Sequence, residues 1–373
     1  MEQFMEQFVL IFVGLILSIF ILLLILKTHR KFGLGESLDD VQAFIENNGG
    51  THVSHLTFLN DKEVYRTKNN KVLFVYQLIG NKAIVLGDPI GKDEYIRDAI
   101  QEFQKYCKEL NKTPVYYQVS ERFLLFYRNF HYRLFKLGEE AKLNLHEFSL
   151  AGKKGAKLRT RKNKFERNGY QFAVSFPPHN HGLLETAEDI SNCWLGERKE
   201  KGYSVGFFCK DYLSRFPIAT LTNPDGKMIA FASLACDKQK QKKTFTVDLM
   251  RHTSDCPHGT MDFLFLSIFQ WCKEQGYDWC SMGMSPLANV GTSKQATTYE
   301  KLARYVFEHG DSFYKFKGLH EYKNKFTPQW ESRYLVYKKS FLPFLFLQLI
   351  FLIHQNNTKK AEAKLARGLR RAS

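Results

Sequence analysis

The segment from Thr244 to Gly291 constrains the fold more than any other part of the chain. It opens with apolar and polar residues in alternation over 244–250, which is the pattern of a half-buried strand. Turn-forming residues over 255–259 lead into an apolar-rich helical stretch that we expect to end near Gly276. A second short strand, roughly 279–282, completes a strand–turn–helix–strand unit. Such a unit predicts an α/β fold.

Two charged residues, Asp248 and Arg251, stand in the first strand of this unit. They have opposite strand parity, so they face one site only if the strand bulges or ends near Met250. The plainer interpretation is an ion pair at a strand end. The functional interpretation is a pair that grips a substrate carrying both an ammonium and a phosphate.

Residues around the following turn are candidates for substrate binding. A helix N-terminus beside a strand end suits an anionic group, which singles out His258, Gly259 and Thr260, and we expect Thr260 to cap the helix. The glycine- and aromatic-rich segment 202–212 suits the wall of a cleft. Its Tyr212 is a candidate hydrogen-bond donor, although a core tyrosine is the plainer interpretation.

Ordered blocks along most of the chain carry a specific resemblance. In the segment above they are VDLMRH (247–252), PHGTMDFLF (257–265), WCKEQGY (271–277) and GMSPLANVG (283–291). Elsewhere they are SHLTFLNDK (54–62), LGDPIG (86–91), YYQVSERFLLFYR (116–128), FKLGEEA (135–141), WLGERKEKGYSVGFF (194–208) and FKGLHEYKNKF (316–326). From about residue 38 to about 337 the chain resembles the catalytic domain of lysyl-phosphatidylglycerol synthases, the multiple peptide resistance factor family.

The resemblance implies tandem N-acetyltransferase-like (GNAT-like) domains joined by a basic helix. It implies an aminoacyltransferase that moves lysine, or alternatively alanine, from aminoacyl-tRNA to phosphatidylglycerol by transesterification. The product would be a cationic or neutralised lipid that gives resistance to cationic antimicrobial peptides. The implied partners are Lys-tRNA, phosphatidylglycerol and an anionic membrane surface. No metal or organic cofactor is expected, and the oligomeric state stays open.

Four residues are candidate catalytic residues under this resemblance. Asp248 would hold the substrate ammonium or a hydroxyl, and Arg251 and Lys323 would hold phosphate or the developing charge. Glu166 would orient the aminoacyl group. The chain departs from the family at Lys317, where an acid or amide is common, and this puts a simple transfer of amino-acid specificity in doubt.

A strongly basic segment, 152–169, joins the two predicted domains. Leu158 and Phe165 are seven residues apart and would share a helix face that packs down. The segment is either a solvated surface helix or a track for the phosphates of tRNA or lipid headgroups, and the net charge of +16 also indicates an anionic partner. The predicted tRNA-binding ridge consists of Lys153, Lys157, Arg161 and Lys164.

Two apolar segments indicate a membrane. Phe8–Leu26 is an uninterrupted apolar run of about 28 Å as a helix, which fits one transmembrane span. Its acidic N-terminal flank disfavours a signal peptide, and the basic residues after it predict a cytoplasmic catalytic domain on a single-pass anchor in the cell membrane. Phe341–Ile353 is too short to span comfortably, so with the basic tail after it we favour an interfacial helix over a second span. The plainer alternative is a buried terminal helix.

The chain therefore divides into five predicted regions. They are a membrane anchor (1–31), a first GNAT-like domain (37–150), the basic helix (151–169), a second, catalytic GNAT-like domain (170–338), and an apolar segment with a basic tail (339–373). The first domain reads mainly as a scaffold, with Asp88 a weak candidate acid. Its His52 and His55 lack further nearby ligands in sequence, which disfavours a metal site.

Two rival functions stay open. A coenzyme A-dependent acyltransferase of the same superfamily usually carries a glycine-rich pyrophosphate turn, whereas residues 255–260 here contain a single glycine. A Fem-like transferase acting on peptidoglycan precursors is a variant of the favoured function. The second rival is a non-catalytic, membrane-tethered protein that binds tRNA or lipid.

Overall fold

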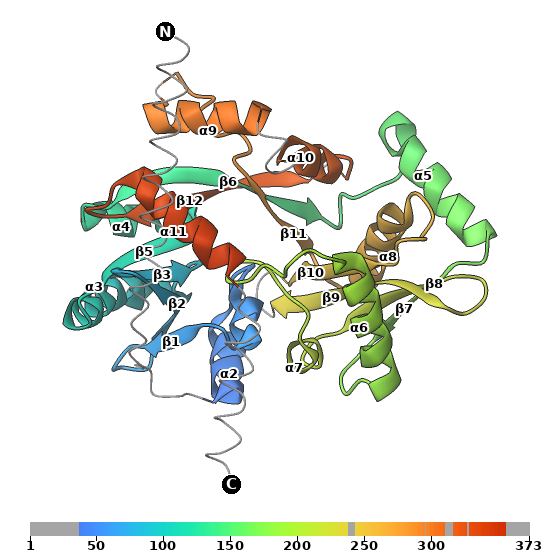
Figure 1. Ribbon diagram of the computed structural model, residues 1–373, viewed down its shortest axis with the longest axis horizontal. Helices are drawn as coiled ribbons and strands as arrows, with labels where there is room; N and C mark the ends of the chain where they lie inside the picture. Colours follow the sequence, from blue (N-terminus) through green and yellow to red (C-terminus); the bar gives the residue numbers. More distant parts are fainter. Residues whose placement is uncertain (1–36, 238–242, 295, 310–315, 327, 356–373) are drawn as a thin grey trace.

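A single mixed sheet runs through the molecule (Figure 1). The computed structural model describes residues 37–237, 243–294, 296–309, 316–326 and 328–355. Within them the sheet has 12 strands, ordered β1-β2-β3-β5-β12-β6-β11-β10-β9-β8-β7, with β4 paired to β2. The sheet contains parallel and antiparallel pairs and is covered by helices, so the predicted α/β class is confirmed.

The N-terminal half, residues 37–150, has a strand hairpin and a strand–helix–strand unit. Strands β2 and β3 form a hairpin that turns at Gly80, and β3 pairs with β5 in parallel after the crossover through α3. Its elements are α2 (Leu38–Asn48), η1 (Ser54–Leu59), β1 (Glu63–Arg66), β2 (Val72–Ile79), β3 (Lys82–Leu86), β4 (Ile90–Gly91), α3 (Asp93–Glu109), β5 (Thr113–Ser120), η2 (Glu121–Phe123), α4 (Leu124–Asn129) and β6 (Arg133–Asn144).

The C-terminal half, from residue 170, also contains a strand–helix–strand unit with parallel strands. The predicted unit at 244–286 is β10–α8–β11, whose two strands are parallel. Its elements, after α5 (Gly152–Arg167), are β7 (Gln171–Ser175), α6 (His181–Leu195), α7 (Lys210–Leu213), β8 (Ile218–Thr222), β9 (Met228–Asp237), β10 (Thr244–His252), α8 (Thr260–Glu274), β11 (Trp279–Pro286), α9 (Thr298–His309), α10 (Phe316–Asn324), β12 (Gln329–Tyr337) and α11 (Leu342–His354).

Strand β12 ties the two halves together. It comes from the end of the predicted second domain, yet it lies between β5 and β6 of the N-terminal half. Strand β6 in turn pairs with β11. An apolar core joins the halves on one face of the sheet, with Val41, Leu56 and Val75 from the first and Ile190, Phe207 and Leu249 from the second.

Helices cover both faces of the sheet. Alternate residues of β2 separate two cores: Phe74 packs toward Phe103 of α3, whereas Val75 faces the core shared by the halves. In the C-terminal half α8 and α5 share one core, and α6 and α7 lie in the other. The junction of the halves is thus enclosed by η1, α6 and α7.

The apolar segment after β12 forms α11. Its Leu342, Leu345, Leu349 and Leu352 are buried in the shared core, while Leu347 and Ile350 are 38% and 53% exposed. Within the described residues, the helices are all too short or too polar to cross a bilayer. The predicted anchor, 1–31, and the basic tail after 355 lie outside the described residues.

Candidate active site at the junction of the halves

A β-bulge in β10 creates the geometry that Asp248 and Arg251 require. Between its pairs with Leu234 and Ala232, β10 has two residues where β9 has one, Ser233. The N–H of Leu249 donates to Ser233 Oγ over 3.1 Å, which satisfies a backbone group that the bulge removes from the ladder. The sequence-based condition for a shared site, a bulge near Met250, is therefore met.

The bulge turns both charged side chains toward α6 and α7. Phe245 and Val247 pack in the core under α8, whereas Leu249 lies in the core shared by the halves. Asp248 reaches α7, and Arg251 reaches the loop after α6. The two charges are close enough that each shifts the pKa of the other.

Asp248 is held by groups from both halves. Tyr212 Oη donates to Asp248 Oδ2 over 2.6 Å, and His55 Nε2 lies 3.5 Å from Oδ1. A Cβ at Gly206 would lie 2.3 Å from the carboxylate, so only glycine allows this approach. Burial would raise the pKa of Asp248, but His55, the Tyr212 hydrogen bond and Arg251 outweigh it and lower the pKa. Asp248 is thus a carboxylate at neutral pH.

The side chain of Arg251 lies between Trp194 at the end of α6 and Glu200 in the loop after it. Its Nη2 donates to Glu200 Oε2 over 2.9 Å, and its Cζ lies 4.0 Å from the ring centroid of Trp194. Burial lowers the pKa of Arg251, and Glu200 partly restores it. The guanidinium remains charged at any physiological pH because arginine starts far above that range.

Lys323 of α10 contacts β11 just beyond the residues of that strand that pair with β10. Pairing between β10 and β11 ends at Thr246 and Ser281, so Asp248 and Gly283 each stand two residues beyond the last pair. Lys323 Nζ donates to the carbonyl oxygens of Gly283 (2.9 Å) and Met284 (3.0 Å). Burial lowers its pKa to about 7, with Glu140 opposing the shift.

A second carboxylate, Glu140 of β6, lies behind Lys323. Arg333 and Ser281 donate to it, and His52 Nδ1 lies 3.5 Å from its Oε2. The other ring nitrogen of His52 lies 2.9 Å from Oε1 of Gln118, the residue in the bulge of β5. Burial would raise the pKa of Glu140, but its partners, His52 and Arg333 foremost, hold it low.

The N-terminal half therefore contributes directly to the site. His52 and His55 each approach a carboxylate on the sheet, Glu140 and Asp248 respectively. Sequence reasoning missed Glu140 and Arg333, and considered the histidines only as metal ligands. Burial lowers the pKa of His52 to about 4, so its ring is neutral and makes hydrogen bonds rather than an ion pair. The signals available in the sequence were the His-x-x-His spacing of His52 and His55 and the adjacent pair Glu139 and Glu140.

The predicted substrate-binding residues after β10 contact a different region. His258 Nε2 lies 3.0 Å from Arg161, and Gly259 packs against the same arginine side chain. The expectation that Thr260 caps α8 is wrong: the N-cap is Gly259 with φ 97°, and Thr260 is already helical, donating to Pro257 O over 2.7 Å. None of the contacts described for these three residues reaches Asp248.

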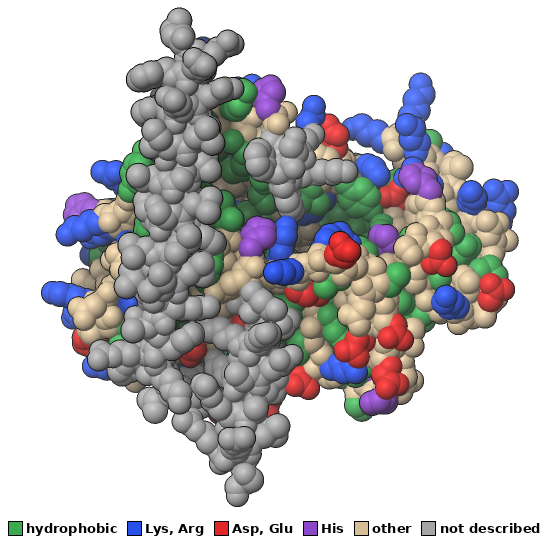
Figure 2. Space-filling model, viewed as in Figure 1, with side chains coloured by type: hydrophobic (Ala, Val, Ile, Leu, Met, Phe, Trp, Pro, Cys, Tyr) green, Lys and Arg blue, Asp and Glu red, His purple; other side chains and the backbone are tan. Residues whose placement is uncertain are grey.

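Arg161 points inward, unlike the rest of the predicted ridge on α5. It forms an ion pair with Asp262, a buried acid in the first turn of α8. The predicted packing face is confirmed, since Leu158 and Phe165 are buried. Lys153, Lys157 and Lys164 are exposed, and Figure 2 shows basic side chains over this helix.

Glu166 lies on the exposed part of α5. Its Oε1 is 2.5 Å from Lys162 Nζ, one helical turn away. The described contacts do not join it to Asp248, Arg251 or Lys323. Within the predicted catalytic set, Asp248 and Arg251 form one cluster, Lys323 is coupled to Glu140, and Glu166 is a separate surface residue.

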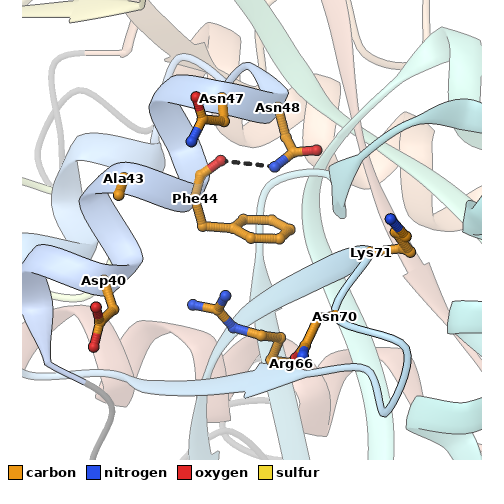
Figure 3. A pocket seen from close by; sticks show the side chains of 8 residues that line it. All are labelled: Asp40, Ala43, Phe44, Asn47, Asn48, Arg66, Asn70 and Lys71. Carbon is orange, nitrogen blue, oxygen red and sulfur yellow. Dashed lines mark hydrogen bonds between the residues drawn. The ribbon is translucent and has the colours of Figure 1, made fainter.

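A surface pocket of about 580 Å³ lies apart from this cluster, between α2 and the turn after β1 (Figure 3). The Arg66 guanidinium lies 4.7 Å from the Phe44 ring centroid, and Asp40, Asn70 and Lys71 complete its polar rim. A smaller pocket, about 460 Å³, lies between η1, which carries His55, and α7, which carries Tyr212.

Comparison with known proteins identifies the family of the chain. The family described as "Phosphatidylglycerol lysyltransferase, C-terminal" matches residues 42–337. A phosphatidylglycerol lysyltransferase of Bacillus subtilis is 39% identical over 329 residues, which are 87% of this chain and 38% of the relative. The chain thus spans well under half the length of that curated relative.

Solved structures show the same fold. The structure of L-PGS from Bacillus licheniformis superposes with a TM-score of 0.77 at 37% identity, covering 87% of this chain and 100% of that chain. The C-terminal domain of a putative lysylphosphatidylglycerol synthetase from Agrobacterium fabrum gives 0.75 at 31% identity, covering 86% and 98%.

Proposed function

The chain belongs to the family of phosphatidylglycerol lysyltransferase C-terminal domains, and we propose that it transfers lysine from Lys-tRNA to phosphatidylglycerol. A hydroxyl of the lipid glycerol attacks the ester carbonyl that joins lysine to the tRNA. The lysyl–lipid ester forms, the tRNA ester breaks, and the proton of the attacking hydroxyl ends on the released tRNA hydroxyl. Because the ester is already activated, positioning and oxyanion stabilisation suffice.

The observation that carries this proposal is the environment of Asp248. A carboxylate kept ionised by His55 and Tyr212, beside the buried guanidinium of Arg251, offers a place for an ammonium next to a place for a phosphate. Lysyl ester and lipid headgroup supply these two groups. Asp248 binds an ammonium of the lysyl group, and Arg251 binds phosphate.

Lys323 is suited to proton transfer. A neutral amine has two N–H groups, and those of Lys323 are used by the carbonyls of Gly283 and Met284, which leaves the lone pair to accept a proton. With a pKa of about 7 the amine can take a proton from the attacking hydroxyl and return it to the leaving tRNA oxygen. In its charged form it stabilises the oxyanion.

The exposed lysines of α5 would bind the tRNA. Lys153, Lys157 and Lys164 present positive charge without a described acidic partner, as a track of phosphates requires. We leave Arg161 out of this proposed track because its guanidinium pairs with Asp262. Glu166, on the same helix, would orient the aminoacyl end only after tRNA has docked.

The membrane would meet the surface of α9 and α11. Six of the nine exposed large apolar side chains described lie on α9, on α11 or at the N-cap of α11. They are Tyr299, Leu302, Tyr305, Phe341, Leu347 and Ile350. Together with the apolar run at 8–26, this surface supports a single-pass membrane protein whose catalytic domain lies against the cytoplasmic leaflet.

The tandem GNAT-like architecture is part of the same proposal. Each half has a strand–helix–strand unit with parallel strands, β3–α3–β5 and β10–α8–β11, and β5 and β10 each carry a bulge. The basic helix α5 connects them.

Radiolabelled transfer tests the proposal. The full chain is incubated with phosphatidylglycerol vesicles and [14C]Lys-tRNA or [14C]Ala-tRNA, and lipid-extractable label is counted. We expect label from Lys-tRNA that depends on phosphatidylglycerol. If only Ala-tRNA labels the lipid, the transferred amino acid is alanine. If neither tRNA labels the lipid, the proposed activity is refuted.

A further inference from the structure

The loop between α6 and α7 carries a cluster that sequence reasoning did not assign. Trp194 lies at the end of α6, and Arg198 and Glu200 follow in the loop. Two guanidinium groups lie over the Trp194 ring: Arg251 Cζ at 4.0 Å from its centroid and Arg198 Cζ at 4.1 Å. Because both distances share one centroid, the two guanidinium carbons are within about 8 Å of each other.

The Arg251 side chain is incompletely satisfied. It is 7% exposed, and its Nε has no hydrogen-bond partner among the described residues. Its other described hydrogen bonds go to Glu200 Oε2 and to the carbonyl of Met250. A buried, unpaired N–H of a charged group is costly, so it marks a position where a ligand acceptor is missing.

Arg198 adds a second guanidinium that retains donors. It is exposed, and its described hydrogen bonds, to the carbonyls of Leu195 and Trp194, use two of its five N–H groups. The stack on Trp194 fixes the guanidinium plane, which favours planar, bidentate recognition of phosphate. Its charge also helps lower the pKa of Arg251, which shows that the two groups interact.

Glu200 occupies the place of an anion. Its carboxylate pairs with Arg251, while its other oxygen accepts the N–H of Phe208 over 3.3 Å. Its side chain is 16% exposed, so it lies nearer to solvent than the guanidinium that it covers. A carboxylate in this position is the resident counterion that an incoming anion would displace.

We propose that Arg251, Arg198 and Trp194 form a binding site for a phosphodiester, with Glu200 as the counterion that the ligand displaces. This inference rests on the proposed function, in which two phosphodiesters are present: that of the lipid headgroup and that at the tRNA 3′ end. A phosphodiester has acceptor oxygens for both guanidinium groups, whose carbons are no more than about 8 Å apart. The structure thus gives Arg251 a partner residue in phosphate recognition.

Binding of soluble probes to the full chain in detergent tests the site without requiring turnover. The probes are glycerophosphoglycerol, which is the lipid headgroup without acyl chains, and the trinucleotide CCA. Trp194 lies in the site, so its fluorescence reports occupancy; Trp194→Phe should remove the change. Arg198→Gln should weaken one probe about tenfold, or about 1.4 kcal/mol, and Arg198→Lys should recover only part of the loss.

Glu200→Gln separates the counterion from a structural role. Glutamine can still accept the Phe208 N–H but no longer competes for Arg251, so probe binding should tighten by at least about threefold. A residue that merely held the loop would weaken binding when changed. Arg97→Gln, an exposed arginine of α3, is the matched control and should change nothing.

The outcomes show whether the phosphodiester belongs to the lipid or to tRNA, and whether the proposed site exists. Weaker headgroup binding by Arg198→Gln assigns the site to the lipid, and weaker CCA binding assigns it to tRNA. The proposal is overturned if wild-type protein binds neither probe, if Arg198→Gln and Trp194→Phe alter neither, or if Glu200→Gln fails to tighten binding. Probe binding by a wild-type protein that transfers no lysine would refute the proposed function and leave this site standing.

Discussion

His55 of the N-terminal half and Asp248 of the C-terminal half meet across the junction, with Nε2 and Oδ1 3.5 Å apart. The carboxylate also accepts from Tyr212, so three segments distant in sequence determine its orientation. The C-terminal half cannot form this arrangement alone, which means that the N-terminal half is more than a scaffold for the sheet.

Replacing His55 tests this dependence. His55→Gln removes the ring that helps keep Asp248 ionised and oriented, and we expect kcat for lysine transfer to fall by roughly three- to tenfold. His181→Gln, an exposed histidine on α6, is the control. Equal kcat for the two variants would show that His55 has no positioning role.

The buried Lys323 amine should make stability depend on pH. Its folded pKa of about 7 lies below its unfolded value, so between about pH 7 and 10.5 the unfolded chain binds more protons and stability rises with pH. Lys323→Met should remove this rise and, because each pKa unit is about 1.4 kcal/mol, stabilise the protein by a few kcal/mol near pH 7.

Denaturant unfolding at several pH values measures the effect, with Lys273→Met on the exposed face of α8 as control. A Lys323→Met variant whose stability follows the wild-type pH profile would contradict the assigned pKa.

The lysines and the arginine of α5 should separate into two classes. Changing Lys153, Lys157 and Lys164 to Gln should weaken tRNA binding and flatten the plot of log K against log salt by roughly 2 to 3 units, at about 0.9 per lost phosphate contact. Filter binding over a salt series gives the slope. If the slope holds while binding to phosphatidylglycerol vesicles falls, the helix serves lipid instead.

Arg161→Gln should act on folding rather than on salt dependence. It leaves the buried Asp262 with only the more distant Lys325, at 3.5 Å, so we expect a loss of about 3 kcal/mol in unfolding free energy. Thermal and denaturant unfolding report this change. If Arg161→Gln leaves the stability unaltered and flattens the plot of log K for tRNA binding against log salt, Arg161 binds tRNA after all.

The apolar face of α11 should bind membranes independently of the N-terminal run. In a chain lacking residues 1–36, Leu347→Gln with Ile350→Gln should reduce sedimentation with anionic vesicles, because both side chains are exposed and lose apolar transfer energy. Leu125→Gln, an exposed leucine of α4, is the control. Vesicle binding that is insensitive to the α11 changes would place the contact elsewhere.

Local patterns were sufficient for much of the fold. Ser37 caps α2 as its type suggests, accepting from the N–H of Asp39, and the hairpin across Gly80 forms between β2 and β3. The opposite parity of Asp248 and Arg251 made a shared site conditional on a bulge or a strand end near Met250, and β10 has the bulge. These features depend on neighbouring residues, which a single sequence displays.

Long-range pairing was not accessible in the same way. Nothing in the sequence near Arg333 indicates that β12 inserts between β5 and β6, where Arg333 meets Glu140. Likewise, the ridge pattern on α5 placed Arg161 with the lysines, because the acid that turns it inward, Asp262, lies on another helix. The prediction that Thr260 caps α8 was wrong for a local reason. Gly259 can adopt φ 97° and therefore occupies the N-cap position itself.

The most direct test of the account is lysine transfer by Asp248→Asn, which keeps the shape of the side chain and removes its charge. If Asp248 binds the lysyl ammonium, transfer from Lys-tRNA to phosphatidylglycerol should drop at least about tenfold, equivalent to about 1.4 kcal/mol or more of transition-state binding. Asp225→Asn, in the exposed turn between β8 and β9, should transfer at the wild-type rate. Wild-type transfer by a folded Asp248→Asn protein would contradict the central claim.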